Sequence, residues 1–377
     1  MNSFIDNYLE HYDVICLQEM FGAFSRRRKR LIRSAHKKGF LWKVSSPQER
    51  SSMYLVDGGC LILSRVRIVA EASTIFQTAG KMADRLAAKG VIYAKLNPKP
   101  GVYVHLFVTH LQALYPGSST VQECMDVQRN QYEDLVDFVS STVAENESPN
   151  DMLVARRLLD RKKKAAGGHS FTFGHTVGVA TPPNQDTMGF LAEKCRRWPI
   201  VLAGDFNCNS RPIPGDVVSK TTKSYLDLCH SLSKVGEFAD ILFDQIGEHP
   251  VTYAAADFSL NGSFSPREIA LTCPTDYHKS GEYVNQSLDY IFLFPPTHEF
   301  LRDQPGSKSA IVLGSPVDRD GSMSPDSRAI QGSVLRPVEV QVRHLDYVPH
   351  PAHQAGESLR YLSDHMALEA VLQISPE

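Results

Sequence analysis

The sequence predicts a mixed α/β fold, on the evidence of two patterns. Short apolar runs of strand length recur along the chain, and residues 121–139 carry apolar side chains near helical spacing. The expected strands lie at residues 13–17, 59–64, 91–96, 102–111, 200–206, 288–294 and 366–374. We find no internal repeat.

The chain is expected to form one elaborated domain over residues 1–377. Of its 377 residues, 42% are hydrophobic and 22% are charged, which is typical of a globular protein with a sizeable core. Two segments interrupt the α/β pattern, at about residues 142–197 and 303–336, and their Gly, Pro, Ser and Thr content predicts insertions.

Composition limits the classes of partner. The formal net charge of -2 gives no global positive field, so we expect no nucleic-acid partner. The seven scattered cysteines are typical of reduced thiols in a cytosolic protein. The N-terminus is too polar for a secretory signal, and no run of about 18 apolar residues predicts a spanning helix. We therefore expect a cytoplasmic protein.

Polar side chains follow or open many of the apolar runs, and we expect them to converge on one rim of the sheet. These residues are Glu19, His110, Asp205, Asn207, Asp289, Asp364 and His365. Asp205 and Asn207 are two apart in "GDFN", so on an extended chain they would project to the same side. Together they predict a site rich in acid, imidazole and amide groups.

A divalent cation fits this set of residues. Mg²⁺ prefers hard oxygen ligands and is usually held by one or two carboxylates plus substrate phosphate oxygens. Glu19 with Asp364 or Asp205 meets that requirement. We expect Mg²⁺ as the cofactor, with Mn²⁺ as an alternative.

The same residues predict hydrolysis of a phosphoester. His365 could take a proton from attacking water if Asp289 fixes its tautomer from the other ring nitrogen. Asn207 and His110 could donate to phosphoryl oxygens as charge builds on them. Each motif alone also has a structural interpretation, because "GDFN" could be a turn and "SDH" a helix cap. Their joint occurrence in this order favours chemistry.

At these residues the chain resembles the endonuclease/exonuclease/phosphatase superfamily, in which "LQE", "TH", "GDFN", "DY" and "SDH" occur in this order. The resemblance implies a four-layer α/β sandwich, in which two packed mixed β-sheets are flanked by helices. Within the superfamily the chain looks most like the neutral sphingomyelinases, through "DGGCLILSR", "DRLAAKGVIYAKL" and "VTHLQA". That branch implies Mg²⁺-dependent hydrolysis of sphingomyelin to ceramide and phosphocholine.

The resemblance also implies roles for single residues. Glu19 would bind the metal, Asp364 would support the metal and the base, and His365 would be the general base that Asp289 orients. Asp205 and Asn207 would position phosphate and water, and His110 would stabilise phosphoryl oxygens. Asp84 and Lys89 would form the family's switch-like pair beside the site. The family also has an earlier strand ending in a metal-site asparagine, and with only 18 residues before Glu19 we expect that strand to be missing here, as in a truncated form.

A basic segment predicts contact with an anionic membrane. Residues 25–38 hold eight Arg and Lys residues, and such a cluster can attract anionic lipid. The expected contacts are Arg26, Arg27, Arg28, Lys29 and Arg30. The competing interpretation is a solvated helix face.

The leading hypothesis is thus a Mg²⁺-dependent sphingomyelin phosphodiesterase of phospholipase C type. It would act on sphingomyelin or a related phospholipid and associate peripherally with the membrane. Two alternatives stay open. One is a superfamily nuclease or inositol-polyphosphate phosphatase; a nuclease should show basic residues around the rim and release from DNA with salt. The other is an inactive homologue that only binds membranes.

Overall fold

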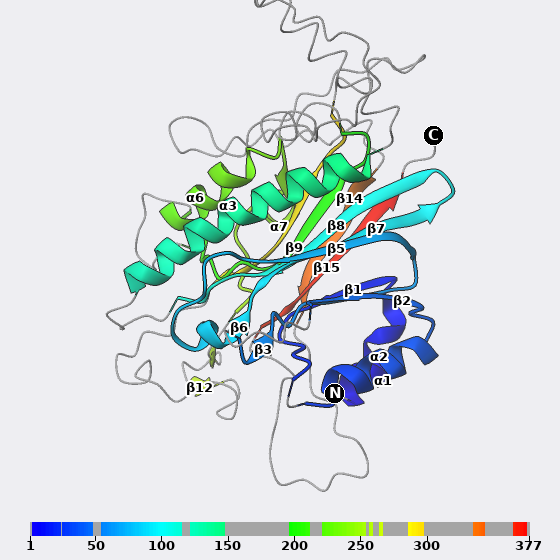
Figure 1. Cartoon of the computed structure of the whole chain (residues 1–377), viewed down its shortest axis with the longest axis horizontal. Helices are drawn as coiled ribbons and strands as arrows, with labels where there is room; N and C mark the ends of the chain where they lie inside the picture. The colour runs from blue at the N-terminus through cyan, green and yellow to red at the C-terminus, as the bar shows by residue number, and fades with distance from the viewer. Residues whose placement is uncertain are drawn as a thin grey trace, which may run out of the picture.

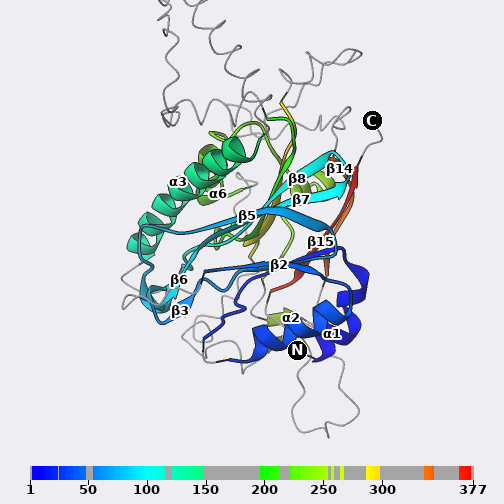
Figure 2. The same cartoon turned by 45° about the vertical axis from the view of Figure 1, so that its right-hand side comes forward.

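Two packed β-sheets with helices on their outer faces form the body of the molecule (Figures 1 and 2). The computed structural model describes residues 2–23, 25–47, 54–114, 121–147, 196–211, 221–253, 256–258, 264–266, 286–297, 335–343 and 365–374. The layers run from helices through two sheets to helices again. The predicted four-layer α/β sandwich is confirmed.

The larger sheet has six strands in the order β10-β13-β9-β8-β7-β5. Neighbouring strands are antiparallel except for β8 and β9, which run parallel. Its strands are β5 (Arg67–Ile75), β7 (Gly90–Lys99), β8 (Val102–His110), β9 (Ile200–Asp205), β10 (Ala239–Asp240) and β13 (Asp289–Phe294). The central strands are buried on both faces, which explains their nearly continuous apolar sequences.

The second layer combines a three-stranded sheet, in the order β1-β4-β2, with a two-stranded ribbon of β14 and β15. The bounds are β1 (Val14–Leu17), β2 (Trp42–Ser45), β4 (Leu61–Ser64), β14 (Leu335–Arg343) and β15 (Ala367–Ile374). A short parallel ribbon joins β3 (Val56–Asp57) to β6 (Ala87–Ala88), and β11 (Ala256–Phe258) pairs with β12 (Phe264–Pro266).

Helices cover both outer faces. On the six-stranded sheet lie α3 (Val121–Asn146) and α6 (Lys223–Leu232); on the other side lie α1 (Asn2–Asn7) and α2 (Arg27–Lys37). Shorter helices are η1 (Leu9–His11), η2 (Met82–Leu86) and α7 (Ile241–Ile246). In the described part of the chain no helix is long and apolar enough to cross a membrane.

Three apolar cores match the three interfaces between layers. One lies between α3, α6 and the large sheet, one between the two sheets, and one under α1 and α2. The expected helix at 121–139 runs on to Asn146, so residues 142–146, which were expected to open the first insertion, are helical. Most of both expected insertions lies outside the described residues.

Candidate functional site

Three adjacent strands of the large sheet place an imidazole and two carboxylates side by side in one row. The register pairs Asp205 on β9 with His110 on β8, and on its other side with Asp289 on β13. All three side chains are buried. The expected convergence of these residues on one rim is therefore a feature of strand pairing.

A tight backbone shapes the end of β9. Gly204 has φ +148°, and a Cβ there would lie 2.1 Å from the carbonyl oxygen of Thr109, so only glycine fits. Asn207 adopts the left-handed region with φ 50°. Its backbone N–H donates to Asp205 Oδ1 over 2.8 Å and its Nδ2 to Asp205 Oδ2 over 3.2 Å.

Asp205 and Asn207 do come together, but not for the reason that the sequence suggested. Strand alternation was expected to aim them to one side, whereas β9 ends at Asp205 and Asn207 lies beyond it. The left-handed turn, which asparagine tolerates better than most residues, carries Asn207 back over Asp205. The amide therefore braces the carboxylate directly.

His365 and Asp289 form a close pair. His365 Nδ1 lies 2.8 Å from Asp289 Oδ2, and the other ring nitrogen, Nε2, lies 3.9 Å from Asp205 Oδ2. Ligand atoms of Asp205, Asp289 and His365 all lie within 4.8 Å of one another. Asp364, expected to support this centre, lies outside the described residues.

The electrostatics of this cluster suit a cation. Burial raises the pKa of Asp205 above its usual range, and the neighbouring Asp289 raises it further, against the opposing charges of His365 and Lys89. A buried carboxylate beside a second carboxylate is costly unless positive charge approaches it. The hard oxygen donors are those that Mg²⁺ prefers. The residues present therefore fit a divalent cation.

His110 lies between a cation and an anion. Its Nε2 is 3.1 Å from Lys89 Nζ and 3.4 Å from Asp205 Oδ2. Burial, followed by the charges of Lys89 and His365, holds the pKa of His110 well below its ordinary value. His110 is therefore a neutral bridge at neutral pH.

Asp84 and Lys89 meet beside the site, as the sequence suggested. Lys89 Nζ lies 2.9 Å from Asp84 Oδ1 and donates to the carbonyl oxygen of Leu111 over 2.6 Å. Asp84 Oδ2 accepts from the backbone N–H of Ala113 over 2.7 Å. The pair thus links η2 to the loop that follows β8.

Glu19 does not belong to the cluster of Asp205, Asp289 and His365. It follows β1, is exposed, and has φ 56°, an uncommon conformation for a residue other than glycine. A Cβ on Gly59 would lie 3.1 Å from Glu19 Cα. Burial raises the pKa of the next residue, Cys60, to about 12, and the charges of Lys89 and Asp205 also act on that thiol. The assignment of Glu19 as a metal ligand stays a prediction.

The loop after β1, which contains Glu19, is held by a buried ion pair that no sequence motif indicates. Asp57 Oδ1 lies 3.0 Å from Arg28 NH1 and also accepts the backbone N–H of Gly59, while Oδ2 accepts that of Gly22 over 2.8 Å. Both side chains of the pair are almost completely buried. Asp57 therefore connects the loops on both sides of Glu19 to α2.

This pair corrects one expected membrane contact. Arg28 faces the protein interior and is 5% exposed, so it is not part of the basic surface. Leu31 and Ala35 share its buried face at helical spacing, and this pattern could have revealed its direction. The other expected contacts are exposed: Arg26, Arg27, Lys29 and Arg30.

Two further residues brace the His365–Asp289 pair without belonging to a recognisable motif. The buried Thr252 Oγ1 accepts the backbone N–H groups of Leu288 and Asp289 over 2.9 and 3.1 Å. The ring of Tyr253 lies 5.1 Å from that of His365, and the two residues form a β-bridge. They hold Asp289 and His365 in mutual reach.

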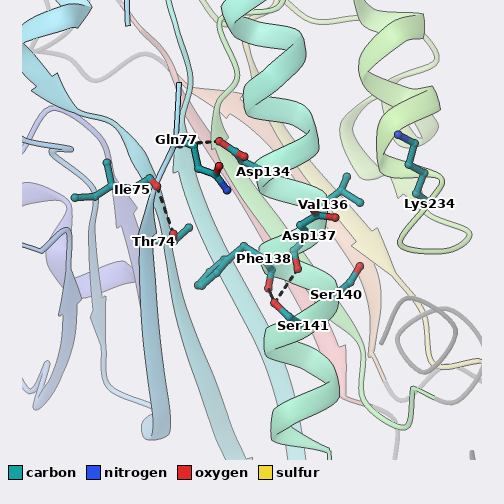
Figure 3. Close-up of a pocket in the computed structure, with 10 residues that line it drawn as sticks. All are labelled: Thr74, Ile75, Gln77, Asp134, Val136, Asp137, Phe138, Ser140, Ser141 and Lys234. Carbon is teal, nitrogen blue, oxygen red and sulfur yellow. Dashed lines mark hydrogen bonds between the residues drawn. The ribbon is translucent and has the colours of Figure 1, made fainter. Parts of the chain in front are cut away.

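A hollow of about 400 Å³ lies elsewhere, between β5 and α3 (Figure 3). Its polar groups are largely engaged with the backbone: Asp134 accepts the N–H of Gln77, and Ser141 donates to carbonyl oxygens of its own helix. None of the residues that line it belongs to the predicted site. The hollow is therefore separate from the rim chemistry.

Comparison with protein families assigns the chain to a family. Residues 1–365 match the model of the Endonuclease/Exonuclease/phosphatase family. The chain belongs to this family. A hydrolase that acts on phosphoesters is consistent with the buried acids and the His365–Asp289 pair of the rim.

Individual relatives point to one branch of the family. The chain is 28% identical to a sphingomyelinase of Dictyostelium discoideum, over 97% of this chain and 73% of that protein. It is 31% identical to sphingomyelinase C 2 of Leptospira interrogans, over 36% of this chain and 22% of that protein. These matches confirm the resemblance to sphingomyelinases that the sequence motifs indicated.

Solved structures with a similar chain path include sphingomyelinase C from Streptomyces griseocarneus. The TM-score is 0.47 at 17% identity, over 97% of this chain and 87% of that one. A structure of beta toxin from Staphylococcus aureus with bound magnesium ions has the same TM-score and identity, over 97% and 88% of the two chains.

Proposed function

We propose that this chain is a Mg²⁺-dependent phosphodiesterase that hydrolyses sphingomyelin to ceramide and phosphocholine. The observation that carries the proposal is the His365–Asp289 pair, whose other ring nitrogen, Nε2, lies 3.9 Å from Oδ2 of the buried Asp205. The similarity to sphingomyelinases over 97% of the chain supports the choice of substrate.

The proposed base is His365. If Nδ1–H donates to Asp289, Nε2 is left as an acceptor on the side of Asp205, where it can take a proton from attacking water. Thr252 and Tyr253 hold the pair, so the imidazole needs little reorganisation. Water then attacks phosphorus, the bond from phosphorus to the ceramide oxygen breaks, and ceramide leaves with a proton.

The carboxylates of the rim would hold the metal. We assign Asp205 and Glu19 to this role, with Asp364 as the third acid that the sequence suggests. Bound Mg²⁺ would supply a Lewis acid for the phosphoryl oxygen. Asn207 keeps Asp205 in one orientation by two hydrogen bonds, so a cation meets a preorganised ligand.

His110, Asp84 and Lys89 complete the proposed site. His110 is neutral and its Nε2 lies 3.4 Å from Asp205 Oδ2, where we assign it to stabilising oxygens of the transition state. Lys89 brings positive charge to the same place and is held there by Asp84. We place the enzyme in the cytoplasm, with peripheral attachment to membranes through exposed basic residues of α2.

The test is release of phosphocholine from sphingomyelin in mixed micelles, with Mg²⁺ and then with EDTA. We expect release that requires Mg²⁺. Hydrolysis of DNA or of an inositol polyphosphate, with sphingomyelin left intact, would assign the chain to another branch of the family. Binding of lipid without any Mg²⁺-dependent turnover would support an inactive homologue.

A further inference from the structure

Three exposed apolar side chains gather beside the catalytic rim. Leu55, Met82 and Leu86 are 56%, 51% and 46% exposed. The backbone N–H of Leu55 donates to the carbonyl oxygen of Leu86 over 2.8 Å, and the parallel β3–β6 ribbon continues from these two residues. Met82 opens η2, which ends at Leu86. We call these three residues the apolar corner.

Asp84, in the middle of η2, connects the apolar corner to the site. Asp84 points inward to Lys89 and to the backbone N–H of Ala113, while Met82 and Leu86 on either side are exposed. Lys89 in turn contacts His110. The turn therefore holds two large apolar side chains in solvent at a short, defined separation from the rim.

Basic residues lie on the same turn as the apolar corner and on a neighbouring helix turn. Arg85 is exposed on the same turn. Two residues after Leu55, Asp57 anchors Arg28, and this ion pair brings the first turn of α2 to the β3–β6 ribbon. Figures 1 and 2 show α2 and the ribbon at the same end of the molecule. The exposed basic residues of that helix turn are Arg26, Arg27, Lys29 and Arg30.

Another exposed apolar pair lacks this setting. Val338 and Val371, on the β14–β15 ribbon, are 53% and 54% exposed, as much as the leucines. Val371 lies opposite Glu339 in the strand register, so an acidic residue stands beside it. Of these two surfaces, only the apolar corner combines exposed apolar side chains with nearby basic residues.

We propose that the apolar corner is the surface by which this chain docks on a lipid bilayer that carries anionic lipid. Leu55, Met82 and Leu86 enter the boundary between headgroups and acyl chains, while Arg85 and the first turn of α2 contact anionic headgroups. The combination supplies the two signals, apolar insertion and charge, that stable attachment to a membrane needs. Binding of the bilayer by the apolar corner does not depend on the proposed function. The further statement that docking turns the rim toward its lipid substrate rests on the proposed function.

The size of the effect follows from the side chains. Partial burial of one leucine changes partitioning by about tenfold, and each basic residue near an anionic surface by about fivefold. The variant Leu55→Ser/Leu86→Ser should therefore bind vesicles at least about tenfold more weakly. Because both side chains are exposed, the variant should fold as the unmodified chain does.

Binding is measured by co-sedimentation with vesicles of phosphatidylcholine and phosphatidylserine, in EDTA so that no turnover occurs. The matched control is Val338→Ser/Val371→Ser, which makes the same chemical change at equal exposure and should bind like the unmodified chain. Vesicles of phosphatidylcholine alone should bind the unmodified chain more weakly, since the basic residues then lack a partner. Turnover on detergent micelles should be unchanged in Leu55→Ser/Leu86→Ser and reduced on vesicles.

Three results would overturn the proposal. One is equal vesicle binding by the corner variant and the control variant. Another is loss of binding only in Leu41→Ser/Trp42→Ser, at the other end of α2, where both side chains are also exposed. The third is a dimer in solution that Leu55→Ser/Leu86→Ser converts to a monomer, because a second copy would then cover the corner. Absence of turnover on micelles would contradict the proposed function alone.

Discussion

Two buried aspartates, Asp57 and Asp205, lie in the same part of the molecule but in opposite electrostatic settings. Asp57 is 5% exposed and is met by the guanidinium of Arg28 and by the backbone N–H groups of Gly22 and Gly59. Asp205 is 6% exposed and faces Asp289, a neutral His110 and the ring of His365.

The difference separates a carboxylate whose charge the protein compensates from one whose setting suits a cation. The charge of Asp57 is compensated within the protein, so Asp57 can hold the Glu19 loop and α2 together. The pKa of Asp205 is raised, because burial and Asp289 are not fully offset by positive charge. A bound cation or a proton would compensate the charge of Asp205.

The largest effect is expected on turnover. His365→Ala should lower phosphocholine release by about 100-fold to 10,000-fold, because it removes the proposed base. The side chain is 29% exposed and lies at the rim, so thermal stability should change little. The control is His230→Ala, an exposed histidine on α6, which should keep full activity. Turnover by His365→Ala close to that of the unmodified chain would remove His365 from the mechanism.

The next effect is on folding. Asp57→Asn leaves the guanidinium of Arg28 buried without its counter-charge, which should cost about 3–5 kcal/mol in the free energy of unfolding. Urea denaturation measures this loss. Adding Arg28→Met should recover part of it, because the unpaired charge is then gone. A loss below about 1 kcal/mol would mean that the pair is not a compensated buried charge.

A smaller effect is expected on metal dependence. Glu19→Gln should raise the Mg²⁺ concentration for half-maximal activity by at least about tenfold, because an amide is a weaker ligand than a carboxylate. Glu10→Gln is the control, since Glu10 is exposed and pairs with Lys38 on the surface. An unchanged Mg²⁺ titration for Glu19→Gln would exclude Glu19 as a ligand.

The smallest effect sharpens the contrast between the two aspartates. Asp205→Asn should raise the stability of the metal-free protein at pH 7.5 by about 1 kcal/mol, because it removes a buried uncompensated charge. A raised pKa means that the folded state binds the proton more tightly. Stability of the unmodified chain should therefore fall as pH rises from the usual value of 3.8 toward the raised one. Urea midpoints in EDTA at several pH values should show this fall, and in Asp205→Asn it should be reduced.

The sequence predicted the parts of the molecule that depend on local pattern. The apolar runs gave most strands of the large sheet because those strands are buried on both faces. It did not predict β5, an edge strand whose exposed and partly buried residues alternate without a continuous apolar run. It placed Asp205, Asp289 and His365 together through motif order, although only strand register explains their distances.

What the sequence could not give depends on partners distant along the chain. Arg28 and Asp57 are 29 residues apart and belong to no shared motif, so a basic run suggested five surface residues where the fold buries one. Thr252 supports Asp289 from 37 residues away through a single hydroxyl. Such contacts carry no periodicity, and only the packed structure reveals them.

The most direct test is whether Mg²⁺ binding depends on Asp205. We would measure the thermal unfolding of the unmodified chain and of Asp205→Asn with Mg²⁺ and with EDTA. Asp240→Asn is the matched control, because Asp240 is also buried with a pKa raised to about 6, yet it caps α7 and accepts from Tyr225 away from the rim. We expect Mg²⁺ to raise Tm in the unmodified chain and in Asp240→Asn but hardly in Asp205→Asn. An equal rise in all three would contradict a metal site at this rim.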